Sequence, residues 1–404
     1  GWGREGRAAH HAVRVRLPSL PLTLFCNEQE AAAAAALGDP PPSVAIEAGA
    51  ERLSAFEIVN KSPGIRPYAP AAVTAGGAGT RFIGGTGLWF GEHAGDNGVV
   101  PHTFCVTGTK GKSTTTSLLA HLLRAAGKRT VLAGNIGLPM LEVLDPRPAP
   151  DEWAIELSSY QTGDVADSGA RPDVAIVLNL FPEHLDWHGS MAAYAAAKAR
   201  IFGAQGCMVL NRQDEAVMAM LPAPVKLKGG KLQPRWHTTF GSNLPQQPGD
   251  FGLEEVNGMR WLVRAHDEAG PDGSLFLQRL LPADVLRIRG LHNACNALAA
   301  LALCLTCVLP LPAGIPPMLL QWLILPLLAL LNALAWWMDM FWLAAVLLWW
   351  LKSSAHLMGC TQAGAFASRS RPAALRCARL PVSRSDRRRT PLATSGPNMV
   401  TKLQ

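Results

Sequence analysis

The chain has 404 residues, which is enough for two or three domains that each bury a core. Its net charge is +7, but the segment from Leu305 onward holds ten basic and two acidic residues, which leaves 27 basic and 28 acidic residues for the first 304. The body is thus almost neutral at −1, and this excludes charge as a reason to expect nucleic acid or a membrane surface as its partner.

Eight cysteines are scattered without the spacing of a disulfide framework. The C-x-x-C pair, Cys304 and Cys307, lies in an apolar run without a histidine, which is not typical of a metal site. We therefore expect a reducing, cytoplasmic location. The chain begins at Gly1 with neither a methionine nor a signal peptide, so we expect the natural start to lie upstream.

Residues 1–93 carry weak motifs. Gly1–Gly6 match G-x-G-x-x-G before a helical pattern, and Pro21–Cys26 read as the next strand. Such a motif normally follows a strand, so we expect the first strand of this domain to lie upstream of Gly1. Lys61–Ile65 form a proline-glycine turn by composition. A polar, glycine-bearing linker is predicted over Ala94–His102.

A phosphate-binding loop is predicted over Val106–Thr116, between an apolar strand that begins at Phe104 and an apolar-striped helix. Gly108 and Gly111 allow the backbone N–H groups to face a phosphate, Lys112 adds a charge, and the Ser113 hydroxyl can bind magnesium. The spacing from Gly108 is one residue shorter than in the usual loop. The alternative is an ordinary strand-turn-helix corner.

Short apolar runs of the buried parallel-sheet kind follow at Thr130–Ala133, Trp153–Leu157 and Val174–Asn179. Glu156 stands at the end of such a strand, where a buried carboxylate is costly unless it is paired or bound to a metal ion. Ligands gather at the carboxyl ends of parallel strands, so Thr107, Glu156 and Asn179 mark the expected active site.

Further along, the residues themselves leave the chemistry open. His184 is compatible with a hydrogen-bonded surface histidine, and Lys198 reads as an ordinary solvated residue of the helix Tyr194–Ile201. Residues 211–285 are rich in glycine and proline, so they indicate polar loops, and they predict no chemistry. A helix begins at Gly290–Ala297, where His292 and Asn293 are compatible with a polar N-terminal cap.

The composition changes abruptly after Cys304. Residues 316–351 are rich in Leu, Ala and Trp with Asp339 as their one charge, and residues 365–390 form a basic segment without periodicity. Hydropathy favours a membrane anchor with a positive flank. The abrupt change in mid-helix instead favours a wrong-frame translation of a GC-rich gene. We adopt the second interpretation and describe 305–404 as an aberrant tail, irregular or hydrophobic helical.

The chain resembles the Mur ligases in the Gly108–Thr114 loop, Gly134–Gly137 and Glu156–Gln161. Within that family it is most similar to enzymes that add glutamate to UDP-N-acetylmuramoyl-L-alanine. Phe82–Thr86 and Asn179–Ser190 favour the L-glutamate branch, although the enantiomer cannot be derived from these residues. The resemblance extends over residues 1 to 304, and the third domain that relatives carry does not follow.

The resemblance implies an α/β fold with a Rossmann-like UDP-substrate domain at 1–93 and a P-loop central domain with a parallel sheet at 94–304. It also implies the site residues. ATP would be bound by Gly108, Thr109, Lys110, Gly111, Lys112, Ser113, Thr114, Asn293 and Asn296. The UDP substrate would be bound by Gly3, Arg4, Glu5, Ser62, Pro63, Gly64, Asn135, Ser158 and Gln161.

Magnesium would be held by Ser113, Glu156, His184 and Lys198, the last as a carbamylated lysine, and catalysis would rest on Lys112, Lys198 and His184. The expected reaction forms an acyl phosphate with ATP and then a peptide bond with glutamate. We expect a monomer that binds neither nucleic acid nor a membrane. Three alternatives stay open: a folylpolyglutamate synthase-like ligase, a nucleotide-binding relative without ligase activity, and a membrane-tethered protein.

Overall fold

The computed structural model describes residues 1–36, 43–44, 49–66, 68–203, 206–228, 230–269 and 275–307, which all belong to one compact unit of the chain. The predicted hydrophobic segment 316–351 and the basic segment 365–390 lie outside the described residues. Within the described ranges, no helix combines the length and the apolar character needed to cross a bilayer.

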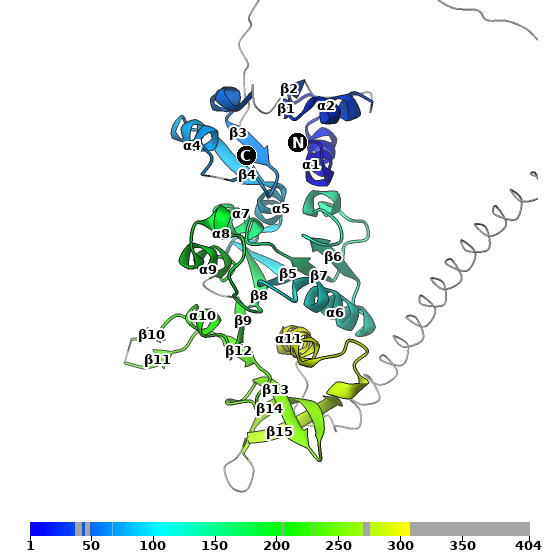
Figure 1. Ribbon diagram of the computed structural model, residues 1–404, viewed down its shortest axis with the longest axis vertical. Coiled ribbons are helices and arrows are strands. Elements are labelled where there is room, and N and C mark those ends of the chain that lie inside the picture. The colour runs from blue at the N-terminus through cyan, green and yellow to red at the C-terminus, as the bar shows by residue number, and fades with distance from the viewer. Residues whose placement is uncertain are drawn as a thin grey trace, which may run out of the picture. The chain divides into compact units, whose positions relative to one another are not determined.

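Short helices and strands alternate in the first 93 residues (Figure 1). They are α1 (Arg4–Arg16), β1 (Leu24–Phe25), α2 (Glu28–Ala35), β2 (Ser43–Val44), the 3-10 helix η1 (Ala50–Ala55), β3 (Ile58–Lys61), α4 (Pro70–Gly77), β4 (Arg81–Gly84) and α5 (Gly85–His93). The strands pair in parallel, β1 with β2 and β3 with β4, as two separate sheets. The predicted strand at 21–26 is confined to two residues, and the Rossmann-like assignment stays a prediction.

At the Gly1–Gly6 motif, where α1 begins, the backbone of residue 6 passes close to the backbone of residue 1. Gly3 is the N-cap of the helix, and a Cβ at Gly6 would lie 2.0 Å from the Gly1 carbonyl oxygen. Glycine at position 6 is therefore required for the chain to fold back on itself at this point.

A nine-stranded sheet organises the rest of the described chain, in the order β15-β14-β13-β12-β9-β8-β5-β7-β6. Its strands are β5 (Val99–Thr107), β6 (Thr130–Gly134), β7 (Glu152–Glu156), β8 (Arg171–Val177), β9 (Cys207–Asn211), β12 (His237–Phe240), β13 (Phe251–Val256), β14 (Met259–Ala269) and β15 (Leu275–Pro282). Pairing is parallel from β6 to β13, and β13-β14-β15 are antiparallel. The predicted α/β class with a parallel central sheet is confirmed.

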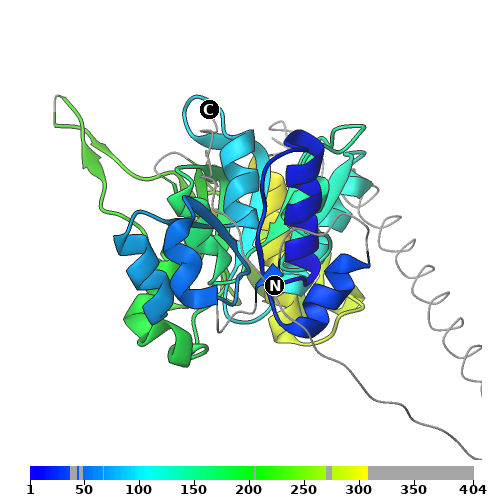
Figure 2. The same ribbon diagram turned by 90° about the horizontal axis from the view of Figure 1, so that it is seen from above.

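Helices and 3-10 turns lie between these strands and after the last of them. They are α6 (Lys112–Ala125), η2 (Met140–Val143), α7 (Gln161–Asp167), α8 (Leu185–His188), α9 (Met191–Ala199), α10 (Glu215–Met218), η3 (Ala283–Val285) and α11 (Leu291–Cys307). A small antiparallel hairpin of β10 (Val225–Lys226) and β11 (Leu232–Gln233) extends away from the sheet (Figure 2).

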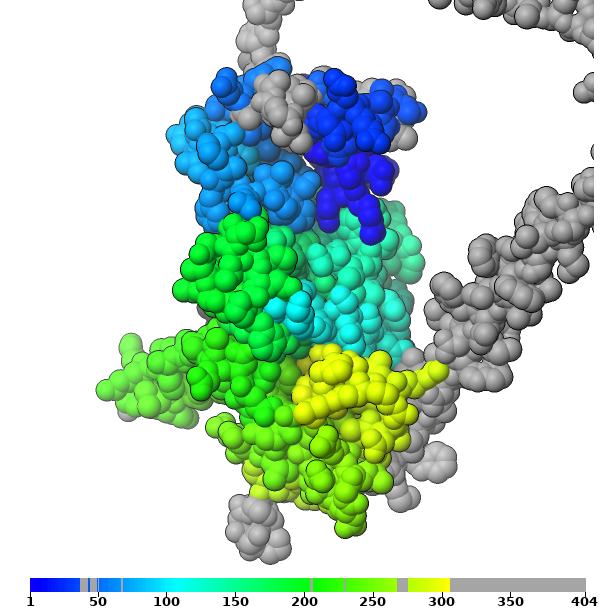
Figure 3. Space-filling model, in the orientation of Figure 1, coloured from blue at the N-terminus to red at the C-terminus, as the bar shows by residue number. Residues whose placement is uncertain are grey.

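Alternate residues of the buried strands fill two cores on opposite faces of the sheet. Phe104 and Val106 of β5 pack in the core that includes Leu119 of α6 and Leu298 of α11, whereas Cys105 packs with Trp89 of α5 in the other core. Helices α6 and α11 lie side by side, and their atoms touch in Figure 3. Strands covered on both faces need continuous apolar runs, which explains why these segments were recognisable in the sequence.

Two sequence predictions need correction. The predicted linker at 94–102 contains the start of β5, because Val99 and Val100 pair with Arg171 and Pro172 of β8. The stretch 211–285, which predicted loops, supplies β12 to β15. In β13 only the first three residues, Phe251–Leu253, are buried, and β15 mixes buried, half-buried and exposed residues. These strands therefore lack the long apolar run that marks the central ones.

Candidate active site at the carboxyl ends of the parallel strands

The predicted phosphate loop joins β5 to α6 and depends on two glycines in the left-handed region. Gly108 has φ 148° and Gly111 has φ 86°. A Cβ at Gly108 would lie 2.9 Å from the Cβ of Leu178, and one at Gly111 would lie 2.4 Å from Oδ1 of Asn296. The loop can therefore turn and pack only with glycine at these positions, and α6 begins directly after Gly111 with its free N–H groups at the loop.

Asn179, just after β8, holds this loop from the neighbouring strand. Its Oδ1 accepts hydrogen bonds from the backbone N–H of Thr109 at 3.1 Å and of Lys110 at 2.8 Å, and its Nδ2 donates to the Lys110 carbonyl at 3.0 Å. The hydroxyl groups of Thr109 and Tyr194 lie 3.0 Å apart. The sequence placed Asn179 at a strand end without a role, and the structure shows that it orders the loop.

The two loop lysines differ in their surroundings. Lys110 is exposed, and its Nζ pairs with Oε1 of Glu183 at 2.6 Å. Lys112 is half-buried and donates from Nζ to the Thr109 carbonyl at 2.9 Å. Burial lowers the pKa of Lys112, while the nearby charges of Glu156 and Glu183 oppose that shift. Ser113 and Thr114 follow in the first turn of α6.

The predicted nucleotide segment of α11 does reach the phosphate loop. Asn296 Oδ1 lies 3.4 Å from the Thr115 hydroxyl, and its Nδ2 lies 3.2 Å from Oδ1 of Asn293. Asn293 also donates to the Arg289 carbonyl at 2.8 Å, at the start of the helix. Residues separated by more than 180 positions along the chain therefore share one site.

Glu156 is the last residue of β7 and is 1% exposed. Asn135 Nδ2 donates to its Oε1 at 2.7 Å, whereas Oε2 is buried without a hydrogen-bond partner in the described structure. A cation would relieve the cost of that bare oxygen. No three His, Cys, Asp or Glu side chains gather as a metal cage among the residues that the structure describes. Mg²⁺ is often held by one or two carboxylates and phosphate oxygens, which fits Glu156 beside this loop.

Lys198 is not the solvated helix residue that its pattern suggested, since it is 1% exposed. Its Nζ donates to the Gly108 carbonyl at 2.9 Å and to the Thr107 hydroxyl at 3.2 Å, directly under the phosphate loop. Burial, with a smaller contribution from the charge of Lys112, lowers the pKa of Lys198 to about 7. The face that α9 turns to the sheet also carries Tyr194, one helical turn earlier, which explains the burial.

His184 precedes the short helix α8, and His188 is the last residue of that helix. His184 is its N-cap with φ 55° and is exposed, with its ring centroid 5.2 Å from that of Tyr160. His188 is buried, and its Nε2 lies 2.9 Å from the Ser159 hydroxyl. Burial lowers the pKa of His188, and the charge of Lys198 adds to the shift. Sequence reasoning singled out only His184, although both belong to the same motif.

The predicted substrate residues of the first 93 positions lie in two places, at the start of α1 and in the turn after β3. Arg4, just after Gly3 and before Glu5, donates from Nη2 to the Gly137 carbonyl at 2.8 Å, so the start of α1 meets the Gly134–Gly137 loop that contains Asn135. Burial raises the pKa of Glu5. The turn of Ser62, Pro63 and Gly64 follows β3, and Arg66 just beyond it pairs with Asp186 of α8 at 3.0 Å.

The side chains of Ser158 and Gln161 form hydrogen bonds with each other, and Gln161 also bonds to Thr86. Oε1 of Gln161 accepts from the Ser158 backbone N–H at 3.0 Å and from its hydroxyl at 2.9 Å, and Nε2 donates to the Thr86 hydroxyl at 3.1 Å. These bonds place α7 against α5. A substrate contact for Ser158 and Gln161 stays a prediction.

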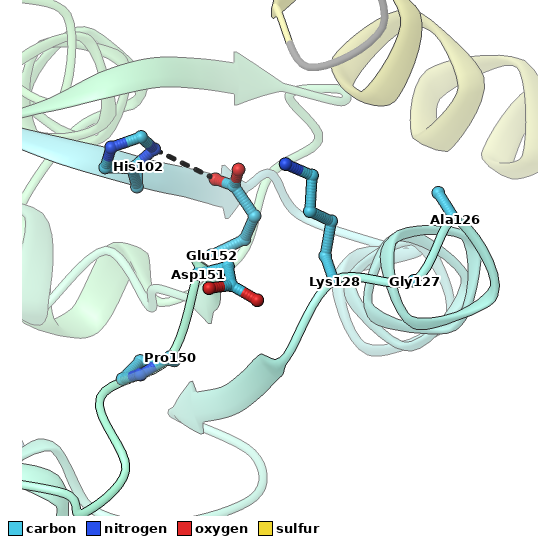
Figure 4. Close-up of a pocket in the computed structure, with 7 residues that line it drawn as sticks. All are labelled: His102, Ala126, Gly127, Lys128, Pro150, Asp151 and Glu152. Atoms are coloured by element: carbon cyan, nitrogen blue, oxygen red, sulfur yellow. Dashed lines mark ion pairs between the residues drawn. The ribbon is translucent and has the colours of Figure 1, made fainter.

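A surface hollow of about 590 Å³ lies beside Glu152, at the amino end of β7 and thus opposite the end that carries Glu156. Figure 4 shows the residues that line it. His102 and Glu152 face each other across it with Nδ1 and Oε2 3.6 Å apart, and Lys128 lies beside them. None of the predicted site residues lines this hollow. The phosphate loop, Glu156 and Asn179, in contrast, lie at the carboxyl ends of parallel strands, as expected for such a sheet.

The sequence model of the Mur ligase middle domain matches residues 106–241. These residues form a Mur ligase middle domain. The matched range contains the phosphate loop, Glu156, His184 and Lys198. The match confirms the predicted resemblance to the Mur ligases over this range, and the site described above lies at the loop end of the matched domain.

Two relatives and one solved structure illustrate the similarity. The UDP-N-acetylmuramoyl-L-alanine--L-glutamate ligase of Xanthomonas campestris pv. campestris strain 8004 is 62% identical over 216 residues, which cover 53% of this chain and 46% of that enzyme. The UDP-N-acetylmuramoylalanine--D-glutamate ligase of Albidiferax ferrireducens is 51% identical over 262 residues, which cover 61% and 51%. The chain thus spans about half the length of these curated relatives. The crystal structure of a murein peptide ligase from Psychrobacter arcticus is 18% identical with a TM-score of 0.40, over 75% of this chain and 63% of that one.

Proposed function

We propose that the chain is an ATP-dependent ligase that joins glutamate to UDP-N-acetylmuramoyl-L-alanine in the synthesis of peptidoglycan precursors. One observation carries the proposal: the Mur ligase domain brings Lys112, Lys198 and a carboxylate with an unsatisfied oxygen, Glu156, to the same loop edge. The relatives named above support the choice of substrates.

ATP would lie with its terminal phosphates at the start of α6. The N–H groups there have no partner within the helix, and the helix dipole and Lys112 favour negative charge at that point. Asn179 holds Thr109 and Lys110 in place before a nucleotide arrives, so little reorganisation is needed on binding. Asn293 and Asn296 would complete the nucleotide site from α11.

Magnesium, when bound, would neutralise charge on the phosphoryl group that is transferred. Glu156 and Ser113 would hold one ion, and His184 with a carbamylated Lys198 would hold a second. The lowered pKa of Lys198 leaves much of its amine neutral near pH 7, and the neutral amine is the form that attacks carbon dioxide. The new N–C bond forms as the amine loses a proton, which yields a carbamate with one negative charge.

The reaction would then have two steps. A carboxylate oxygen of the L-alanine unit attacks the γ-phosphorus of ATP, and the bond to ADP breaks. The glutamate amine attacks the acyl carbon, phosphate leaves with its bonding pair, and the amine gives up a proton. Lys112 would stabilise the charge that moves between the phosphoryl oxygens in the first step.

We further propose L-glutamate as the amino acid, because relatives named for L-glutamate reach 62% identity and the D-glutamate ligase reaches 51%. The reaction would take place in the cytoplasm. Cys26, Cys105, Cys295 and Cys304 are free thiols in the part of the chain that the structure describes, which is typical of a reducing compartment.

A ligation assay tests the proposal. The purified chain is incubated with UDP-N-acetylmuramoyl-L-alanine, ATP, Mg²⁺ and either glutamate enantiomer, and the product is measured by mass spectrometry. We expect product with L-glutamate, a loss of roughly 10²-fold for Lys112→Ala, and little change for Lys128→Ala at the other end of α6. ATP binding without product would identify a nucleotide-binding relative instead, and product from a folate substrate would favour the folylpolyglutamate synthase-like alternative.

A further inference from the structure

A buried ion pair joins the first part of the chain to the Mur ligase domain. Lys61 Nζ and Asp164 Oδ1 lie 2.8 Å apart, and their side chains are only 7% and 5% exposed. Lys61 is the last residue of β3, and Asp164 lies in α7. Lys61 begins the turn segment 61–65 that the sequence indicated, whereas Asp164 carried no sequence signal.

The turn from β4 to α5 is shaped around this carboxylate. A Cβ at Gly84 would lie 2.1 Å from Asp164 Oδ2, and one at Gly87 would lie 2.6 Å from the Asp164 carbonyl oxygen. Burial raises the pKa of Asp164, and the charge of Lys61 opposes this shift. The strand end, the turn and α7 therefore meet at one charged, closely packed point.

Stability alone is a weak reason for such a pair. Removing two charges from water costs about as much as their attraction returns, and apolar residues of similar volume are often as stabilising. A buried pair does, however, define one relative placement of the segments that carry it, because any other placement leaves a charge without a partner.

The segments joined here are both predicted to bind substrate. Lys61 directly precedes the turn of Ser62, Pro63 and Gly64. Asp164 lies three residues after Gln161, on the helix that follows Glu156 and Ser158 in the chain. The Gln161–Thr86 hydrogen bond is a second link between α7 and α5. The pair is thus positioned to set the distance between the turn after β3 and the segment after β7.

We propose that Lys61 and Asp164 are positioning residues, which hold the Ser62–Gly64 turn against α7 so that the muramoyl-alanine part of the UDP substrate can bind. This inference rests on the proposed function. Its specific consequence is that breaking the pair weakens binding of the UDP substrate but leaves the phosphate loop, and thus ATP binding, intact.

Calorimetric titration of the full chain with UDP-N-acetylmuramoyl-L-alanine and, separately, with ATP tests this consequence. We expect Lys61→Met and Asp164→Asn to weaken binding of the UDP substrate by about tenfold or more, with the Kd for ATP within about twofold of the original. Arg279→Met serves as the control, because it removes an exposed ion pair of 2.7 Å with Glu254 far along the sheet.

A single variant leaves one buried charge unpaired and can unfold the chain. The double variant Lys61→Met with Asp164→Asn removes both charges at similar volume, so it should fold, retain ATP binding and still bind the UDP substrate weakly. Gly84→Ala should have the same selective effect, because its methyl group would displace the Asp164 carboxylate. Gly76→Ala is the matched control, since a Cβ there has nothing within 4 Å.

The outcomes separate the two proposals. If the unmodified chain binds neither ATP nor the UDP substrate, the proposed function is wrong and this inference falls with it. If the unmodified chain binds both and the folded double variant binds the UDP substrate equally well, the positioning role alone is overturned. Equal losses for ATP and the UDP substrate would mean a general structural role and would also overturn it.

Discussion

Strand β7 carries a buried glutamate at each end, and the two ends differ in nearly every other respect. Glu152, at the start, is 4% exposed and faces His102 across an open hollow, and burial raises its pKa. Glu156, at the end, is 1% exposed, bonds Asn135 and lies close enough to Lys112 and Lys198 for its charge to raise their pKa values against the effect of burial. Burial of a carboxylate therefore does not by itself mark a site.

The two ends of helix α6 also differ, and here the end near the candidate site is the start of the element. Gly111 at its start has φ 86° and packs against Asn296, whereas Gly127 just past its end has φ 83° and would have open space around a Cβ. The start of the helix, with its unpaired N–H groups, lies at the same edge as Glu156. Parallel strands followed by helices bring these features together at one edge of the sheet and not at the other.

The largest difference in ligation rate between the two ends of the parallel strands is expected from Glu152 and Glu156. Glu156→Gln should reduce ligation by roughly 10²-fold because it removes the charge that would hold a cation. Glu152→Gln should leave the rate within about twofold of the original, because Glu152 lies at the other edge. Initial rates of ADP release would measure both. A Glu156→Gln enzyme at the full rate would remove Glu156 from the metal site.

A smaller difference, in ATP affinity, is expected between substitutions of Gly111 and Gly127. Gly111→Ala and Gly127→Ala should each cost about 1–2 kcal/mol of unfolding free energy, because alanine is strained at positive φ. Only Gly111→Ala should also weaken ATP binding, by about tenfold or more, since its methyl group would collide with Asn296. Urea unfolding and ATP titration would separate the two effects. Equal ATP affinity in both variants would contradict the assignment of the loop.

A change of another kind, in the pH dependence of stability, is expected from Lys198. Lys198 has a pKa of about 7 when folded against an ordinary value of 10.5, so between these values the unfolded chain binds more protons and stability rises with pH. Lys198→Met lacks this contribution. The unfolding free energy of the original chain, relative to the variant, should therefore increase from pH 7 towards pH 10 by up to about 1.4 kcal/mol per pH unit. Parallel curves would mean that Lys198 is not perturbed by burial.

Several parts of the candidate site were predictable because each is encoded by residues that are adjacent in the sequence. The phosphate loop and the strand that ends at Glu156 are continuous motifs, and their short apolar runs identify a buried parallel sheet. The strands of 211–285 were missed because their burial depends on partners, such as β9 for β12, that lie elsewhere in the chain. Lys198 was read as solvated because nothing in its neighbours along the chain reveals the sheet that covers it.

The sequence by itself predicted the resemblance to the Mur ligases, the glycine-bearing loop before α6 and the candidate residues for chemistry, because these depend on residue type and spacing along the chain. Only the tertiary structure decided which of them meet. It placed Lys198 under Gly108, Asn296 against Gly111 and Asp164 against Lys61, over separations of 90 residues or more in each case. Burial and partner choice are properties of the packed fold, and they set the charge state and the orientation on which the proposed chemistry depends.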